Sequence, residues 1–260
     1  MVGPPSRVVD IFLACEEAVR RGVLIRRANR QDKEFHFQEW FRTQLGHLAI
    51  PYDAPARNTY PDFRLVESTE GYELKGLAYP GREANYDSNS QVPTGFHNGR
   101  TIYYLFGRYP KDPDGDEYPV IDLVMCHGSF LNADREYTHE NKNIKGFGSY
   151  GDIMIRDRKM YVSPTPFALI EGAAAQRTLV LPRDAQPDAR LEPAGTLLRV
   201  EATNLVIGYE FDLRSNVLTP KRIANSRAGT RHGFIAYRRR GSPGPPVAMK
   251  AASATQESGA

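Results

Sequence analysis

Residues 61–76 read PDFRLVESTEGYELKG, and this stretch predicts the centre of the fold. Residues 62–67 and 72–76 are short strand-like runs, and the polar segment STEG lies between them. Short runs with period-two patterning, separated by a few polar residues with a glycine, are typical of a β-hairpin. The sequence therefore predicts a hairpin with a four-residue turn, in which Glu67 lies opposite Tyr72.

This hairpin is expected to gather three ionisable side chains on one face. Alternate residues of a strand share a face, so Glu73 and Lys75 project together and Leu74 projects to the other side. In the register set by the four-residue turn, Asp62 joins Glu73 and Lys75, and the apolar residues turn toward the core. A slip of one residue would separate the two acids. The apolar pattern and the grouping of the acids therefore predict the same face.

Two carboxylates beside a lysine are suited to the hydrolysis of a phosphodiester. A divalent metal held by carboxylates stabilises charge around phosphorus and activates a water molecule. Mg²⁺ prefers hard oxygen ligands and keeps several of its waters, so Asp62 and Glu73 are sufficient to anchor it. Lys75 can orient or deprotonate the attacking water and neutralise developing charge. The alternative interpretation is a surface hairpin in which Glu73 and Lys75 form a cross-strand pair.

The order Pro61-Asp62 followed by Glu73-Leu74-Lys75 resembles the signature of the PD-(D/E)XK nuclease superfamily, most clearly over residues 34–76. The resemblance implies a restriction-endonuclease-like core, a central mixed β-sheet flanked by helices. It also implies that Asp62, Glu73 and Leu74 hold Mg²⁺ and that Lys75 is catalytic. In that superfamily a helix before the hairpin often supplies a further acid. Glu39 is the candidate here, with Glu34 behind it.

The chain is expected to be a mixed α/β (α+β) protein with one nuclease domain over residues 1–240. The domain comprises a helical part at 7–46, the catalytic hairpin at 62–76 and a basic, β-rich part at 178–240. Apolar spacing predicts helices from residue 7 to near Gly22 and from Lys33 to Leu45. Further elements are expected as strands at 101–106, 120–126, 153–155, 159–162, 197–202 and 204–211, and as a helix at 136–142. The Gly-, Pro-, Ser- and Ala-rich segment 241–260 is predicted to be a disordered tail.

Composition limits the class of protein. The chain has 260 residues, 40% of them hydrophobic and 25% charged, which is typical of a globular protein with a full core. Cys15 and Cys126 are too few for a disulfide framework or a zinc cluster. The sequence carries neither an apolar run of about 20 residues nor the pattern of a secretory signal. These features predict a cytoplasmic protein with no membrane segment.

Polar and basic residues after the hairpin are candidates for contact with DNA. Amide, guanidinium and hydroxyl groups of the long loop 77–100 can pair with base edges. These candidates are Arg82, Asn85, Ser88, Asn89, Ser90, Gln91, His97, Asn98 and Arg100. Segment 214–240 contains eight Arg or Lys residues and no acid, so Lys221, Arg222 and Arg231 are candidates for phosphate contact. Arg135, His139 and Lys142 form a second possible face, and solvated loops are the alternative for each set.

The sequence therefore favours a type II restriction-like endonuclease that hydrolyses double-stranded DNA at a specific site and leaves 5′-phosphates. A homodimer is expected, because two-fold symmetry lets one centre address each strand. A cognate DNA methyltransferase is expected in the same system. Three alternatives stay open. These are a repair or structure-selective nuclease of the same superfamily, a non-catalytic nucleic-acid-binding protein, and an unrelated α/β enzyme.

Overall fold

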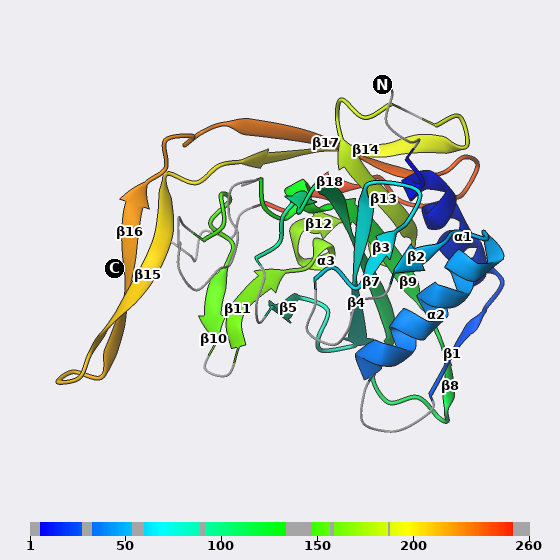
Figure 1. Cartoon of the computed structure of the whole chain (residues 1–260), viewed down its shortest axis with the longest axis horizontal. Helices are drawn as coiled ribbons and strands as arrows, with labels where there is room; N and C mark the ends of the chain where they lie inside the picture. The colour runs from blue at the N-terminus through cyan, green and yellow to red at the C-terminus, as the bar shows by residue number, and fades with distance from the viewer. Residues whose placement is uncertain are drawn as a thin grey trace.

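The computed structural model describes residues 6–27, 33–53, 60–88, 92–133, 147–156, 159–186 and 188–251 (Figure 1). Its helices are α1 (Val8–Arg20), α2 (Lys33–His47), the short α3 (Pro166–Leu169) and a 3₁₀ turn, η1 (Gly128–Phe130). The strands are β1 (Leu24–Arg26), β2 (Tyr52–Asp53), β3 (Phe63–Leu65), β4 (Glu70–Tyr79), β5 (Asn85–Ser88), β6 (Phe96–His97), β7 (Arg100–Pro110), β8 (Glu117–Pro119), β9 (Asp122–His127), β10 (Met154–Arg156), β11 (Lys159–Pro164), β12 (Ile170–Glu171), β13 (Arg177–Pro182), β14 (Leu191–Val200), β15 (Asn204–Asp212), β16 (Val217–Ala224), β17 (Arg231–Arg239) and β18 (Ala248–Met249).

One large mixed sheet organises the fold. It has nine strands in the order β14-β17-β13-β9-β7-β4-β3-β2, with β6 added beside β7. Strand β4 lies in its interior, antiparallel to β3 and parallel to β7. Strands β9 and β13 also pair in parallel, so the sheet is mixed in direction. The chain is a mixed α/β protein with a large mixed sheet and few helices.

The two faces of this sheet bury different cores. Helices α1 and α2 pack on one face, where Tyr72 and Leu74 of β4 join their apolar side chains. The other face is covered by β5, η1, α3, β12 and β18, which pack on Leu77 of β4 and on alternate residues of β7. A central strand that is buried on both faces has near-continuous apolar sequence, as β7 has. Each side chain of β4 therefore belongs to one of two separate environments.

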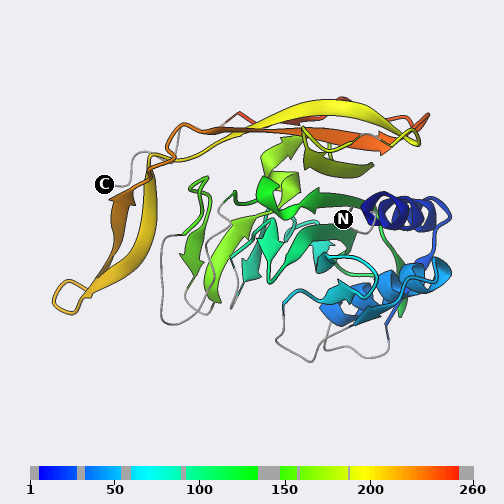
Figure 2. The same ribbon diagram turned by 45° about the horizontal axis from the view of Figure 1, so that its top comes forward.

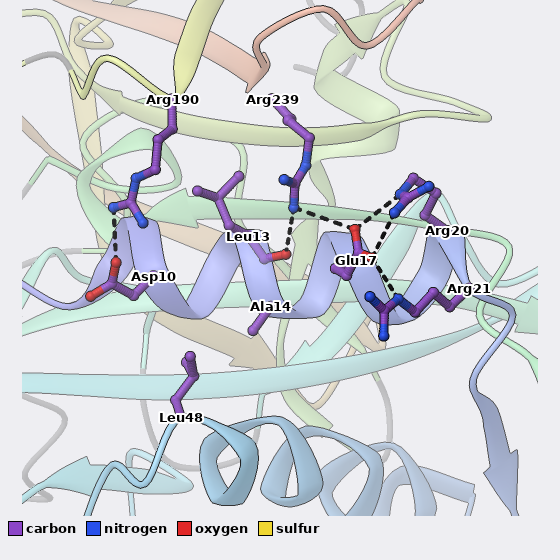
Figure 3. A pocket seen from close by; sticks show the side chains of 9 residues that line it. All are labelled: Asp10, Leu13, Ala14, Glu17, Arg20, Arg21, Leu48, Arg190 and Arg239. Atoms are coloured by element: carbon purple, nitrogen blue, oxygen red, sulfur yellow. Dashed lines mark hydrogen bonds and ion pairs between the residues drawn. The ribbon is translucent and has the colours of Figure 1, made fainter.

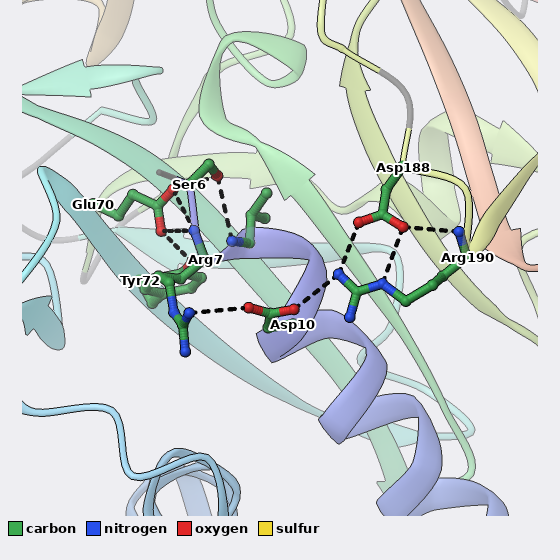
Figure 4. Close-up of polar contacts among 8 residues, drawn as sticks. Ser6, Arg7, Asp10, Glu70, Tyr72, Asp188 and Arg190 are labelled. Atoms are coloured by element: carbon green, nitrogen blue, oxygen red, sulfur yellow. Dashed lines mark hydrogen bonds and ion pairs between the residues drawn. The ribbon is translucent and has the colours of Figure 1, made fainter. Parts of the chain in front are cut away.

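The start of β4 is tied to the start of α1 (Figure 4). The buried carboxylate of Glu70 accepts hydrogen bonds from the Ser6 hydroxyl, 2.5 Å away, and from the Arg7 backbone N–H at 3.1 and 3.2 Å. The Tyr72 hydroxyl donates a further bond of 2.9 Å to the same carboxylate. A negative charge at a helix N-terminus satisfies unpaired N–H groups and is favoured by the helix dipole. This contact fixes where the strand begins.

Most of the expected elements are found, with shifted ends. The predicted helices at 7–22 and 33–45 are α1 and α2, and the six strands predicted after residue 100 correspond to β7, β9, β10, β11, β14 and β15. The helix predicted at 136–142 lies outside the described residues. Loop 77–100 is more ordered than expected, because β5 pairs with β11 and β6 pairs with β7.

The prediction of a disordered tail from residue 241 is wrong for residues 241–251. Strand β18 pairs with β12, and Val247 is buried. The Lys250 ammonium donates to the carbonyl of Phe167 at 2.9 Å. The prediction rested on the Gly-, Pro-, Ser- and Ala-rich composition of the segment. It overlooked two apolar side chains, Val247 and Met249, which complete the core on the α3 side. In the part of the chain that the structure describes, no helix is both long enough and apolar enough to span a membrane.

Candidate active site

The hairpin of β3 and β4 forms in a register different from the expected one. Phe63 lies opposite Tyr72, where Glu67 was expected, so the first strand is displaced by four residues (67 to 63). The connection is held by Arg100, whose Nη1 donates to the carbonyls of Leu65, Ser68 and Glu70 at 2.9, 3.0 and 3.3 Å. Because four is an even number, the displacement leaves each side chain on its expected face.

The two acids and the lysine come together on the sheet face opposite α1 and α2. The carboxylate of Asp62 accepts the backbone N–H of Leu74 at 2.8 Å, which fastens Asp62 beside β4. The Lys75 ammonium lies 2.8 Å from Oε1 of Glu73, and the two side chains are only 15% and 12% exposed. The N–H and C=O of one strand residue point to the same edge, so the Leu74 carbonyl also faces the Asp62 side.

Tyrosines that the sequence did not single out line the same place. The Tyr60 hydroxyl lies 2.7 Å from the Tyr104 hydroxyl, and Tyr104 is the β7 residue in register with Glu73. Burial, and then the negative charge of Glu73, raises the pKa of Tyr60 well above its usual value. The Lys75 ammonium lies 5.8 Å from the ring of Tyr86 on β5. These neighbours exclude water and strengthen electrostatic interactions at the carboxylates.

A signal for only one of these tyrosines was present in the sequence. Tyr60 precedes Asp62 by two residues and would share its face if the strand extended that far. Tyr104 and Tyr86 are placed by the β4–β7 register and by the β5–β11 pairing, which join segments far apart in the chain. Spacing along the sequence does not encode these contacts.

Gly71 allows the Asp62 segment to approach β4. A Cβ atom at Gly71 would lie 2.6 Å from Cγ of Pro61 and 3.0 Å from Cδ1 of Ile102. Both neighbours are buried, so Pro61 would have to move, and Asp62 would move with it. The glycine therefore contributes to the position of the first carboxylate.

Replacement of Gly71 by Ala is expected to displace Asp62 and, in an assay of the DNA cleavage that the sequence predicts, to lower the rate by about tenfold to a hundredfold, because small displacements of reacting groups are costly. Overpacking should also lower the free energy of unfolding by about 1–3 kcal/mol. Single-turnover cleavage and urea unfolding measure the two effects. Gly46→Ala, at a helix position where a Cβ would meet nothing within 4 Å, is the matched control. An unchanged rate in the folded Gly71→Ala protein would mean that Asp62 tolerates displacement.

The prediction that Glu39 joins the site is wrong. Its carboxylate pairs with Arg42 at 2.6 Å on α2 and lines a hollow beside Trp40. Helix α2 packs on the other face of the sheet, where the Phe37 ring lies against Gly107. The sheet itself therefore separates Glu39 from Glu73. The side chain of Glu34 lies outside the described residues.

The site accordingly contains two acids. Among the described residues, no group of three or more His, Cys, Asp and Glu side chains is placed to hold a metal ion. Asp62 and Glu73 carry two negative charges and Lys75 one positive charge, so one negative charge is in excess. Two carboxylates with a backbone carbonyl nearby are an oxygen-only donor set, which fits Mg²⁺ with its remaining waters.

The residues expected to read DNA after the hairpin have several different roles. Arg100 is part of the scaffold, because its guanidinium holds the carbonyls of the β3–β4 connection. Arg82 is exposed and lies 3.8 Å from Asp87. Asn85 and Ser88 are partly buried ends of β5, which pairs with β11. Asn89, Ser90 and Gln91 lie outside the described residues.

His97 and Asn98 lie beside Tyr60, one of the tyrosines that line the site. The His97 ring lies edge-on to Tyr60 with 5.0 Å between centroids, and Asn98 Nδ2 is 2.9 Å from His97 Nε2. Burial, and then the charge of Arg64, lowers the pKa of His97 below its usual value. Neutral imidazole and amide groups at the rim can form hydrogen bonds with a nucleic acid without contributing charge.

The basic segment 214–240 is less one-sided in the structure than in the sequence. Arg239 pairs with the buried Glu16 at 2.5 Å, and Arg227 pairs with the buried Glu201 at 3.1 Å. Arg238 and Arg240 donate to backbone carbonyls. Lys221 and Arg222 lie on the β15–β16 hairpin and Arg231 opens β17, all three exposed. Arg135, His139 and Lys142 lie outside the described residues.

A hollow along the outer side of α1 is also rich in arginine, but it is built from ion pairs (Figure 3). Glu17 binds Arg20 and Arg21, each at 2.6 Å, and Arg239 lies 3.7 Å from the same carboxylate. Exposed pairs of this kind contribute little to stability and leave the cations neutralised. The hollow therefore offers no reactive constellation comparable to that at Asp62.

Comparison of the chain with models of known protein families, with curated proteins and with solved structures finds no match. The site therefore has to be interpreted from its own geometry.

Proposed function

We propose that the chain is a Mg²⁺-dependent endonuclease that hydrolyses duplex DNA, with Asp62, Glu73 and Lys75 as its catalytic centre. The observation that carries this proposal is the hydrogen bond from Leu74 N–H to the Asp62 carboxylate. That bond brings two segments of the hairpin together, so that a second acid and a lysine lie beside the first. A cross-strand surface pair of Glu73 and Lys75 would not require a second, separately fastened carboxylate.

The architecture around the centre supports a restriction-endonuclease-like core. Strand β4 lies between an antiparallel neighbour and a parallel one, and helices cover the face behind it. Glu73 and Lys75 project from a strand in the interior of the sheet, where packing on both faces limits their movement.

The chemistry of the site follows from its charges. When bound by Asp62, Glu73 and the Leu74 carbonyl, Mg²⁺ would neutralise phosphate charge and lower the pKa of a coordinated water. The Lys75 ammonium, now paired with Glu73, is placed to donate a hydrogen bond to the attacking water or to a phosphate oxygen. Water oxygen bonds to phosphorus, the bond from phosphorus to the 3′ oxygen breaks, and the 3′ oxygen takes up a proton. The products are a 5′-phosphate and a 3′-hydroxyl.

We further propose that cleavage is site-specific, of the type II restriction kind, and that a homodimer and a companion DNA methyltransferase belong to the system. The polar rim formed by His97 and Asn98, next to Tyr60, supports direct contact with a nucleic acid near the carboxylates. Asn85 and Ser88 remain proposed DNA contacts on β5, as does the exposed Arg231 at the start of β17.

Incubation of the purified chain with phage DNA and Mg²⁺ is expected to give discrete fragments with 5′-phosphates, and EDTA should prevent cleavage. Agarose electrophoresis shows whether the fragments are discrete, and end-labelling shows whether they carry 5′-phosphates. A smear that follows DNA shape would favour a structure-selective nuclease with the same centre. Intact DNA with Mg²⁺, Mn²⁺, Co²⁺ and Ca²⁺ would contradict the proposal.

A further inference from the structure

Strands β15 and β16 form a two-stranded ribbon that extends away from the rest of the molecule (Figures 1 and 2). We call this ribbon, residues 204–224, the arm. β15 contributes 9 residues and β16 contributes 8, and most of them are exposed. An isolated two-stranded hairpin is marginally stable at best in water. An arm of this length therefore needs a surface to pack against.

Toward its tip the arm has one mostly apolar face, and the opposite face mixes charged side chains with Val217. Phe211 lies opposite Leu218, and Tyr209 lies opposite Pro220, so these four side chains share a face. The other face carries Glu210 and Lys221, whose charged atoms are 3.3 Å apart. Alternation of this kind is typical of a ribbon with one buried face. Phe211 and Leu218 are nevertheless 51% and 49% exposed.

Among the described residues, the contacts between the body of the protein and the apolar face lie at the base of the arm. The Phe147 N–H donates to the carbonyl of Val206 at 2.6 Å, and the rings of Phe147 and Tyr209 lie 6.2 Å apart. Tyr161 completes this small cluster. Phe211 and Leu218 continue the same face beyond the body, so the apolar surface is built to be covered along its full length.

The charge of the arm favours a protein partner over DNA. Glu210 and Asp212 oppose Arg214, Lys221 and Arg222, which leaves a net charge of +1 (three cations minus two acids). Lys221 is already paired with Glu210, and Asp212 accepts the Arg214 N–H of the turn at 2.8 Å. Surfaces that bind DNA are far more positive than this.

We infer that the arm is a dimerisation element, which packs its apolar face against the same face of a second copy of the chain. Face-to-face packing would bury Tyr209, Phe211, Leu218 and Pro220 of each copy against the same side chains of the other copy. A two-fold contact needs only one self-complementary patch, which the Phe211–Leu218 pair provides. The outer edge of β16 is protected by Pro220, which has no N–H, and by Lys221 and Arg222. The contact therefore forms through the face and closes at two copies.

This inference deepens the proposed homodimer by naming the surface that forms it, and it does not rest on nuclease activity, because dimerisation is measured without DNA or metal. Sedimentation velocity of the full chain from about 0.1 to 50 µM should show a dimer. Phe211→Asp, and separately Leu218→Asp, should each raise the dissociation constant about thirtyfold or more, as the loss of a central apolar anchor does. Phe211→Ser, a milder change, should shift it in the same direction.

The matched control is Phe35→Asp, since Phe35 is 46% exposed on α2 and far from the arm in sequence. It should leave the dissociation constant unchanged. Thermal unfolding of each variant shows whether the body remains folded. A parent chain that stays monomeric at 50 µM, or a dimer that survives both arm substitutions, would overturn the inference. A monomeric parent whose arm variants bind duplex DNA more weakly would instead make the arm a DNA contact.

Discussion

Replacement of Lys75 by Ala should lower the single-turnover rate of Mg²⁺-dependent DNA cleavage at least about a thousandfold, while DNA affinity changes little. A positioned acid–base group contributes about 10²–10⁴-fold, and a preorganised charge contributes a similar factor. The Lys75 ammonium lies 2.8 Å from Oε1 of Glu73, directly beside a site carboxylate. Its removal takes away charge stabilisation that acts at the reacting phosphate and little of the surface that binds the duplex.

Quenched-flow cleavage of an end-labelled duplex measures the rate, and fluorescence anisotropy in Ca²⁺ measures the affinity. Lys111→Ala is the matched control, because Lys111 is an exposed lysine in the connection that follows β7. Its rate should equal that of the parent. Undiminished cleavage by the folded Lys75→Ala protein would remove Lys75 from the mechanism. A parallel loss of affinity would assign it to binding.

Replacement of Arg108 by Ala should lower the free energy of unfolding by about 3–5 kcal/mol, the range found when one partner of a buried ion pair is removed. The Arg108 Nε donates to Oδ1 of Asp122 at 2.8 Å, and the two side chains are 6% and 0% exposed. Arg108 also stacks on the rings of Tyr79 and Phe167, at 4.2 and 4.7 Å from their centroids. The truncation would leave the Asp122 carboxylate buried without its cation.

Urea unfolding followed by circular dichroism measures this loss. Asp122 also accepts the backbone N–H of Ala175, so Asn is the substitution that keeps an acceptor there. The double variant Arg108→Met with Asp122→Asn should therefore recover most of the lost free energy. Arg190→Ala, which breaks exposed pairs with Asp188 at 2.7 Å and with Asp10 at 2.8 Å, should cost about 1 kcal/mol or less. Equal effects of the two Ala substitutions would mean that burial of the Arg108 pair is unimportant.

Local patterns predicted the two long helices, eight of the eighteen described strands and the face on which the charged residues lie. Asp62, Glu73 and Lys75 share a face because strand alternation is a property of the backbone, which needs no knowledge of tertiary contacts. The register of the β3–β4 hairpin was missed because it depends on Arg100. This residue lies on β7, 30 or more residues further along the chain than the three carbonyls that it binds. A register error of four residues leaves each side chain on its predicted face, whereas an error of one residue would have moved it to the opposite face.

The assignment of Glu39 failed for a related reason. Helix periodicity shows which residues of α2 are apolar, but it does not show which face of the sheet receives them. Phe37 fits against Gly76 and Gly107, two positions without side chains on neighbouring strands, and this packing places α2 behind the site. Likewise, the acids that neutralise Arg227 and Arg239 come from Glu201 and Glu16, and Glu16 is more than 200 residues away in the chain.

The bond between Glu70 and the residues that open α1 has a practical meaning for anyone handling this molecule. Glu70, three residues before Glu73 on β4, is hydrogen-bonded to Ser6 and Arg7. Affinity tags, fusions or N-terminal truncations that disturb Ser6 and Arg7 are therefore expected to shift β4 and, with it, Glu73 and Lys75. Modifications are better placed elsewhere on the surface, away from this junction.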